Sequence, residues 1–139
     1  MSFEIPIERG KVMEFASATQ SNNEAYTGAN AVIPPTFLTT AGLVWEPREA
    51  SDLAALDIDL HRLLHGEEEY IFYGPLPRAG QSLTVSSRLG DQWVREGKRG
   101  GAMRFIRLLR EYRDEAGTLV AEQSTTLVQT SRPPQEGVS

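Results

Sequence analysis

Apolar positions near the start of the chain recur at helical spacing. Val12, Phe15 and Ala16 lie on one side of a segment that begins at Glu8, and polar residues occupy the other side. The short polar side chains of residues 19–23 compete for backbone hydrogen bonds. The pattern therefore predicts a helix that begins near residue 8 and frays in this polar stretch.

A second helix is predicted where the chain is apolar on nearly every side. Pro34-Pro35-Thr36 is a rigid entry, since proline is tolerated in the first turn of a helix. Residues 37–45, Phe-Leu-Thr-Thr-Ala-Gly-Leu-Val-Trp, then follow almost without a polar face. A helix that is apolar all round is usually buried. We therefore expect a buried helix over about 36–45.

The period of the pattern changes in the second half of the chain from 3.6 to 2. Alternating or strand-like runs, separated by turns rich in Gly and Pro, are typical of antiparallel strands. Two of the runs have 11–12 residues, about twice the usual strand length of ~5–6. The predicted class is α+β, with helices first and an antiparallel sheet afterwards. The expected strands span residues 67–73, 82–93, 102–113 and 119–130.

Length, net charge and cysteine content limit the classes of protein to which the chain can belong. The 139 residues suffice for one domain, which we place at 1–130, with a flexible polar tail at 131–139. A net charge of −5 argues against binding to duplex nucleic acid. The chain has no cysteine, which excludes disulfides, iron–sulfur clusters and thiol nucleophiles. No apolar stretch is long enough to span a membrane, and the start lacks a signal-peptide core, so we expect a cytoplasmic protein.

Several motifs occur in a fixed order along the chain. The motifs are Phe15-Ala16, Pro34-Pro35-Thr36-Phe37, His65-Gly66-Glu67-Glu68-Glu69-Tyr70, Pro75-Leu76-Pro77-Arg78-Ala79-Gly80-Gln81 and Gly117-Thr118-Leu119-Val120-Ala121-Glu122. The ordered set resembles the N-terminal MaoC-like dehydratase family, which includes the non-catalytic A-type subunits of two-subunit (3R)-hydroxyacyl-ACP dehydratases. The resemblance implies a single hot-dog domain, an antiparallel sheet wrapped around a central helix, that pairs with another such domain through its sheet edge.

In that family the implied chemistry is reversible hydration of a trans-2-enoyl thioester. Catalytic members use one Asp and one His, in a pattern resembling G-D-x-N-P-x-H after the first helix. Here Ser21 stands at the Asp position, Asn23 keeps the Asn, and Tyr26 stands at the His position. Hydroxyl groups are not general bases at neutral pH. The acid–base pair is therefore missing, and we assign no catalytic residue at these positions.

The start of the predicted central helix departs from the family as well. Catalytic relatives have a His-Gly pair there, and the Gly N–H polarises the thioester carbonyl. This chain has Pro34-Pro35, and a proline nitrogen has no proton to donate. The N–H of Thr36 is a substitute displaced by one residue. Together with the missing Asp–His dyad, this predicts a non-catalytic subunit that works with a catalytic partner.

Substrate contacts are expected in two regions. Asn23, the 34–37 segment, Tyr70 and Phe72 are candidates to line an acyl-thioester tunnel beside the central helix. A basic glycine-rich loop with Arg95, Lys98 and Arg99 is a candidate for coenzyme A phosphates or for an acidic carrier protein, and a solvated hairpin tip is the competing interpretation. Asp57 and Asp59 have no neighbours that complete a metal site, so we expect no metal and no cofactor.

Three functions remain open from the sequence. The first is an acyl-CoA- or acyl-ACP-binding subunit, homodimeric in isolation and paired in its active form with a catalytic MaoC-like chain. The second is a free-standing hydratase or thioesterase that uses His65 or Glu67, the one close pair of a histidine and a carboxylate in an otherwise apolar run. The third is a non-catalytic acyl-binding regulatory module. His61 is expected at the surface or at an interface.

Overall fold

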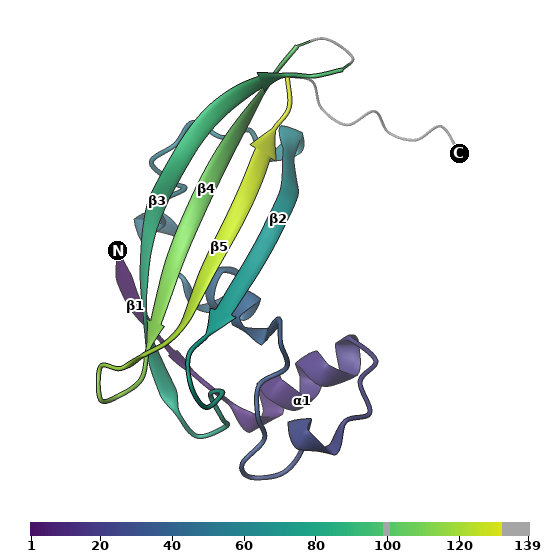
Figure 1. The fold of residues 1–139 in the computed structure, drawn as a ribbon, viewed down its shortest axis with the longest axis vertical. Coiled ribbons are helices and arrows are strands. Elements are labelled where there is room, and N and C mark those ends of the chain that lie inside the picture. The colour runs from purple at the N-terminus through teal and green to yellow at the C-terminus, as the bar shows by residue number, and fades with distance from the viewer. Residues whose placement is uncertain (99–100, 132–139) are drawn as a thin grey trace.

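A five-stranded antiparallel sheet organises the chain. The computed structural model describes residues 1–98 and 101–131. The order of strands across the sheet is β1-β3-β4-β5-β2, so β1 and β2 are its two edges (Figure 1). The strands are β1 Ser2–Pro6, β2 Leu63–Phe72, β3 Ser82–Glu96, β4 Ala102–Arg113 and β5 Leu119–Gln129.

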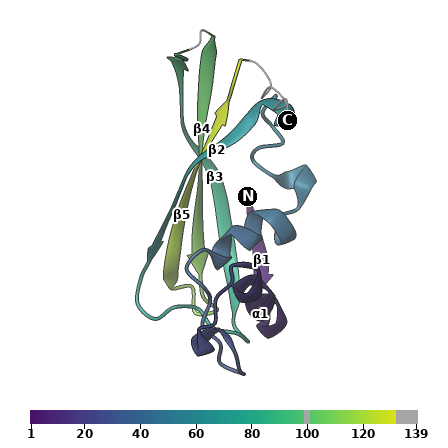
Figure 2. The ribbon, with the colours of Figure 1, turned by 90° about the vertical axis from the view of Figure 1, so that its right-hand side faces the viewer.

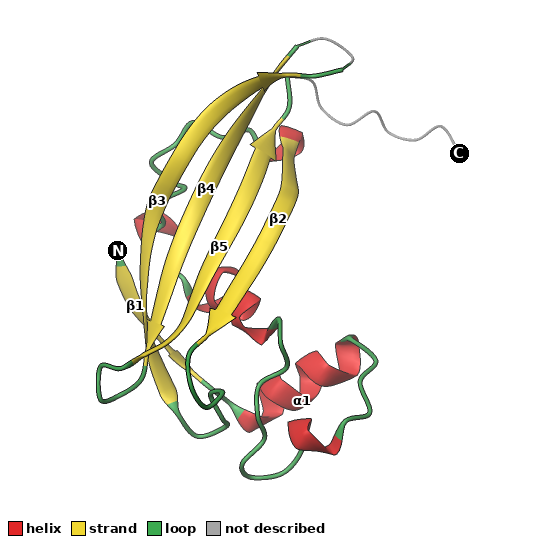
Figure 3. Cartoon of the chain, in the orientation of Figure 1, coloured by secondary structure: helices red, strands yellow, loops and turns green. Residues whose placement is uncertain are grey.

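The helical elements are short and lie together on one side of this sheet. Figure 2 shows them all on one face, which we call the inner face, while no described element covers the opposite, outer face. The longest helix is α1, Arg9–Ala18, which follows the edge strand β1 (Figure 3). Within the described residues, no helix is long and apolar enough to cross a membrane. The short helical turns are η1 Glu24–Tyr26, η2 Phe37–Thr39, η3 Ala41–Trp45, η4 Arg48–Ala50 and η5 Leu60–Arg62.

The central helical segment forms, but it is neither a single α-helix nor buried throughout. A 3₁₀ turn, η2, leads into a π-helical turn, η3. Phe37 and Leu38 are fully buried, whereas Leu43 is 78% exposed and Val44 52% exposed. The expectation that every side of 37–45 is buried is therefore wrong for its second half. Apolar composition predicts which residues prefer burial, but the single sheet covers only one side of this segment.

Alternation along β4 shows how the sheet divides its residues between the two faces. Ile106, Leu108, Arg110 and Tyr112 are buried on the inner face, and the residues between them are partly exposed on the outer face. Tyr112 is the largest fully buried side chain and belongs to the hydrophobic core with Phe37. Side chains along a strand alternate between the two faces of the sheet, so the pairing register of the strands determines which residues face the helical turns.

The strands match the sequence expectation closely. β4 has the expected bounds, and β3 and β5 differ from theirs by a few residues at one end. β2 begins at Leu63, four residues earlier than expected, because it pairs with β5 from its first residue. The 3–7 segment adds a fifth strand, β1, at the edge, where Pro6 is tolerated. Residues 132–139, most of the expected flexible tail, lie outside the described part of the chain, as does Arg99.

Candidate functional site

A pocket of about 450 Å³ lies between the central helical segment and the inner face of the sheet. Its rim includes the exposed residues Leu43, Leu64 and His65, so it opens beside the edge strand β2. Six leucines supply the apolar part of its lining, and a group of polar side chains supplies the rest. The leucines are Leu43, Leu53, Leu63, Leu64, Leu108 and Leu127, and the polar group is Thr39, Glu46, Ser51, His65, Glu68, Arg110, Gln123 and Thr125.

Glu68 is the centre of the polar wall. His65 Nε2 lies 2.7 Å from Glu68 Oε2, and Thr125 Oγ1 donates a hydrogen bond of 3.0 Å to Glu68 Oε1. Gln123 Nε2 donates a further hydrogen bond to the same carboxylate oxygen. A carboxylate held by three partners is fixed in orientation and holds the His65 ring in turn.

A β-bulge brings His65 and Glu68 to the same face. The register between β2 and β5 shifts between His65 and Glu67, so residues three apart share the inner face there. Gly66 fits at the bulge because a Cβ at this position would lie 2.9 Å from Val128 Cγ2. The sequence had suggested Glu67 as the partner of His65. That pairing does not form, because the bulge leaves Glu67 on the outer face, opposite Thr126.

A buried ion pair borders the same pocket. Arg110 Nη2 lies 2.6 Å from Glu46 Oε2, and the two side chains are only 7% and 5% exposed. Gly42 makes room for the guanidinium group within the helical segment. An arginine on a sheet usually lies on the solvent-exposed face. Arg110 is instead buried on the inner face, where Glu46 supplies the carboxylate that pairs with it.

Two tyrosines extend the polar network into the core. The hydroxyl of Tyr112 lies within hydrogen-bond distance of the Leu38 carbonyl oxygen, at 3.1 Å, and of Gln123 Oε1, and it donates its single proton to one of these two acceptors. Burial raises the pKa of Tyr112 well above its usual value. Burial, and then the charge of Glu68, raise the pKa of Tyr70 to about 12. Both hydroxyls therefore stay protonated at neutral pH and cannot act there as bases.

The residues at the expected dyad positions make local contacts. Ser21 Oγ accepts a hydrogen bond from the Asn23 N–H at 3.3 Å, and Asn23 Oδ1 accepts one from the Ala25 N–H at 3.0 Å. Asn23 thereby caps the η1 turn, and Tyr26 packs against the hydrophobic core. None of these residues lines the 450 Å³ pocket.

The start of the central segment is poor in backbone N–H donors. The Phe37 N–H donates to the Pro34 carbonyl at 3.0 Å, and neither Pro34 nor Pro35 has an N–H. The Thr36 N–H donates to no group within residues 1–98 and 101–131. Phe37 itself is 1% exposed and packs edge-on against Phe15, with the ring centroids 5.6 Å apart. It is a core residue at the base of the segment.

The other expected substrate contacts lie apart from the pocket lining. Tyr70 and Phe72 face the inner side of β2, stack at 6.3 Å and pack against the core. Arg95 lies over the ring of Phe105 at 5.8 Å near the end of β3, and Lys98 is exposed in the following loop. Sequence patterns did not point to Gln123, Thr125, Arg110 or Glu46, because the polar side chains that line the inner pocket come from separate elements of the chain.

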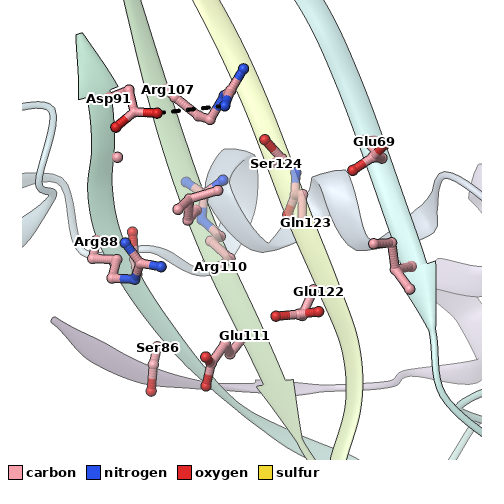
Figure 4. Close-up of a pocket in the computed structure, with 14 residues that line it drawn as sticks. Glu69, Ser86, Arg88, Asp91, Arg107, Arg110, Glu111, Glu122, Gln123 and Ser124 are labelled. Carbon is pink, nitrogen blue, oxygen red and sulfur yellow. Dashed lines mark ion pairs between the residues drawn. The ribbon is translucent and has the colours of Figure 1, made fainter.

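The outer face carries a wider hollow, of about 610 Å³, shown in Figure 4. Its side chains have opposite charges that do not converge on one point. Arg107 reaches Asp91 at 3.8 Å from one side, while Glu69 and Glu122 lie on the two strands of the other side. This is a typical solvated sheet face. Within the described residues, no group of His, Asp or Glu is arranged to hold a metal ion. We therefore assign the candidate site to the inner pocket.

Comparison with known proteins shows the family to which the domain is similar. The family model for the FAS1-like dehydratase domain region matches residues 2–123. A UPF0336 protein of Streptomyces coelicolor is 34% identical over 137 residues, which cover 88% of this chain and 83% of that protein.

Solved structures with the same fold include two complexes from Mycobacterium tuberculosis. A chain of the C-terminally truncated HadBC (3R-hydroxyacyl-ACP dehydratase) complex superimposes with a TM-score of 0.74 at 18% identity, covering 92% of this chain and 94% of that one. A chain of the ChsH1-ChsH2 complex has a TM-score of 0.74 at 16% identity, covering 98% and 90%. The expected single hot-dog domain of the MaoC-like type is thereby confirmed.

Proposed function

Because the chain belongs to the FAS1-like dehydratase domain region family, we propose that it is the acyl-thioester-binding subunit of a (3R)-hydroxyacyl dehydratase or enoyl hydratase. A catalytic MaoC-like partner supplies the Asp and the His. The observation that carries this proposal is the loop after α1. Ser21 and Asn23 make local turn contacts there and Tyr26 packs on the core, so this loop offers no acid–base pair.

The inner pocket supports the binding role. Its leucines suit an acyl chain, and the Thr39 hydroxyl offers a hydrogen bond to an amide or hydroxyl of a pantetheine arm. The pocket opens beside β2, an edge strand of the sheet, and we place the second hot-dog domain at this edge. Both Mycobacterium tuberculosis neighbours are complexes of two different chains. A partner at this edge would bring its catalytic residues to the pocket mouth.

Two features concern the carrier of the acyl group. Arg95, Lys98 and Arg99 are the basic residues proposed to contact coenzyme A phosphates or an acidic carrier protein. Phe37, Tyr70 and Phe72 pack in or against the hydrophobic core and are not part of the pocket lining. We propose that they shape the inner end of the acyl site. A homodimer of the isolated chain would use the same sheet edge as the catalytic partner.

A free-standing hydratase or thioesterase is the second candidate. It is favoured by one contact, the 2.7 Å distance between His65 and Glu68 at the pocket rim. A carboxylate that orients an imidazole is the usual arrangement for a histidine base. In this candidate Glu68 replaces Glu67, which the sequence analysis had suggested as the partner of His65. The regulatory-module interpretation has no specific observation in its favour.

The test compares the chain alone with the chain plus the MaoC-like protein encoded beside it. We expect negligible hydration of crotonyl-CoA by the chain alone and strong hydration by the pair. Turnover by the chain alone that is abolished in His65→Ala and kept in His61→Ala would establish the second candidate instead. His61 is the matched control because it is exposed and lines no described pocket.

Binding is tested separately from turnover. A Leu53→Trp substitution fills the inner pocket, and Val94→Trp adds the same bulk at a 64% exposed position of β3 outside it. We expect calorimetric titration with an acyl-CoA to show loss of binding only for Leu53→Trp. Equal binding by both variants would contradict the assignment of this pocket.

A further inference from the structure

The strand β2 leaves one side of its backbone without a partner strand. It stands at the end of the sheet and pairs only with β5 (Figure 1). Beside it, Leu64 is 46% exposed, Ile71 44% and Leu43 78%. Free backbone donors and acceptors with apolar neighbours make such an edge a template for pairing with another chain.

The outer side of this edge is acidic. Glu67 and Glu69 are both exposed and share the outer face with Glu122 of the adjacent β5. None of the three forms an ion pair with a basic side chain within residues 1–98 and 101–131. Glu68 differs, because it faces inward and is held by His65 and Thr125. The uncompensated charge therefore belongs to the outer side alone.

Pairing of β2 with its own copy would place these charges against each other. In a two-fold antiparallel pair that continues the sheet, outer-face residues lie directly opposite outer-face residues. A register centred on Glu67 or on Glu69 puts that residue opposite itself. A register centred on Glu68 puts Glu67 opposite Glu69 twice. Every register that uses the middle of the strand thus brings like charges together, which destabilises a cross-strand pair.

We infer that the glutamates of β2 select the partner at this edge. They reject a second copy of the chain and fit a hot-dog subunit whose own edge strand presents Lys or Arg on the outer face. The inference rests on the proposed function, in which a catalytic subunit pairs here. Unlike the homodimer expected from the sequence, it makes the isolated chain a poor partner for itself. Repulsion against the wrong partner, with attraction to the right one, is a usual source of specificity.

The test needs no knowledge of the natural partner. The Glu67→Lys/Glu69→Lys variant carries a basic edge, and it is mixed with the unmodified acidic chain. Sedimentation at low salt should show monomers for each protein alone and a 1:1 dimer in the mixture. The Glu67→Gln/Glu69→Gln variant removes the repulsion and should self-associate at least about tenfold more tightly than the unmodified chain. Raising the salt should weaken the mixed dimer, because it screens exposed charges.

The control carries the same change of charge at the other edge of the sheet. Glu4→Lys/Glu115→Lys alters two exposed residues near β1, and a mixture with the unmodified chain should stay monomeric. A tight dimer of the unmodified chain, or a charge-reversed mixture that does not associate, would overturn the inference. Neither result depends on hydratase activity. If the charge-reversed mixture stays monomeric but the chain and its catalytic partner are active together, only the charge selection is wrong. If the charge-reversed mixture forms a dimer but the chain and its partner are inactive together, only the proposed function is wrong.

Discussion

Gly42 and Arg110 are in direct contact across the inner face. A Cβ at position 42 would lie 2.8 Å from Arg110 Nη2 and 3.2 Å from its Cζ. The guanidinium group is held in this place by Glu46, at 2.6 Å. The backbone of the helical segment therefore approaches a buried charge that has little freedom to move away.

A Gly42→Ala substitution is expected to destabilise the protein by about 1–3 kcal/mol, the usual cost of overpacking. The methyl group has to displace a buried, ion-paired guanidinium. Urea denaturation measures the change. Gly10→Ala in α1 is the matched control, since nothing lies within 4 Å of its added Cβ and Ala is favoured over Gly in a helix by about 1 kcal/mol. Equal stability changes in both variants would contradict the contact.

The ion pair makes a second prediction. Replacing one partner, in Arg110→Met or Glu46→Gln, should lower the free energy of unfolding by about 3–5 kcal/mol, because it leaves a buried charge uncompensated or a buried group unpaired. The double variant Arg110→Met/Glu46→Gln should lose clearly less than the sum of the two single losses. Additive losses in denaturant titrations would show that the two side chains do not interact.

The strands could be predicted from the sequence because alternation is a local signal. Leu83, Val85, Leu108 and Tyr112 alternate with polar or exposed residues, and each lies on the face that this pattern predicts. The edge strand β1 was harder to predict. Pro6 argues against a central strand, but it does not by itself indicate whether the segment forms an edge strand or no strand. The bulge at Gly66 gave no local signal, and the close approach of Val128 Cγ2 to this glycine comes from another strand.

The candidate site was predicted less well for the same physical reason. His65 was singled out, but its partner is Glu68 and not Glu67, because the bulge changes the face of the strand. Gln123 and Thr125 belong to a strand more than fifty residues away along the chain. Their roles depend on cross-strand register, which the pattern of a single strand does not fix.

Tyr70 provides a prediction about alkaline pH. Burial and the charge of Glu68 raise its pKa to about 12 in the folded protein, above the usual value near 10 in the unfolded chain. The unfolded state therefore loses its proton first, and stability is retained below about pH 10 and falls as the pH rises toward 12. Tyr70→Phe should show a shallower fall in the free energy of unfolding over this window.

The control for this titration is Tyr73→Phe, which removes an exposed hydroxyl that donates to Glu122. The pKa of Tyr73 is also raised, through that hydrogen bond, but the side chain remains in solvent. Its removal should change the alkaline fall less than removal of Tyr70. The same slope in Tyr70→Phe as in the unmodified protein would contradict the assignment.

Restoring the missing acid–base pair should not restore activity. The Ser21→Asp/Tyr26→His variant supplies the two side chains, but a hydratase also needs an N–H directed at the thioester carbonyl. Pro34 and Pro35 have none, and the Phe37 N–H is already bonded to Pro34. We therefore expect the variant alone to hydrate crotonyl-CoA no faster than the unmodified chain. Adding Pro35→Gly provides a donor at the start of the central segment, and any gain should appear only in this triple variant. Full activity in the double variant would mean that the Thr36 N–H already serves as the donor.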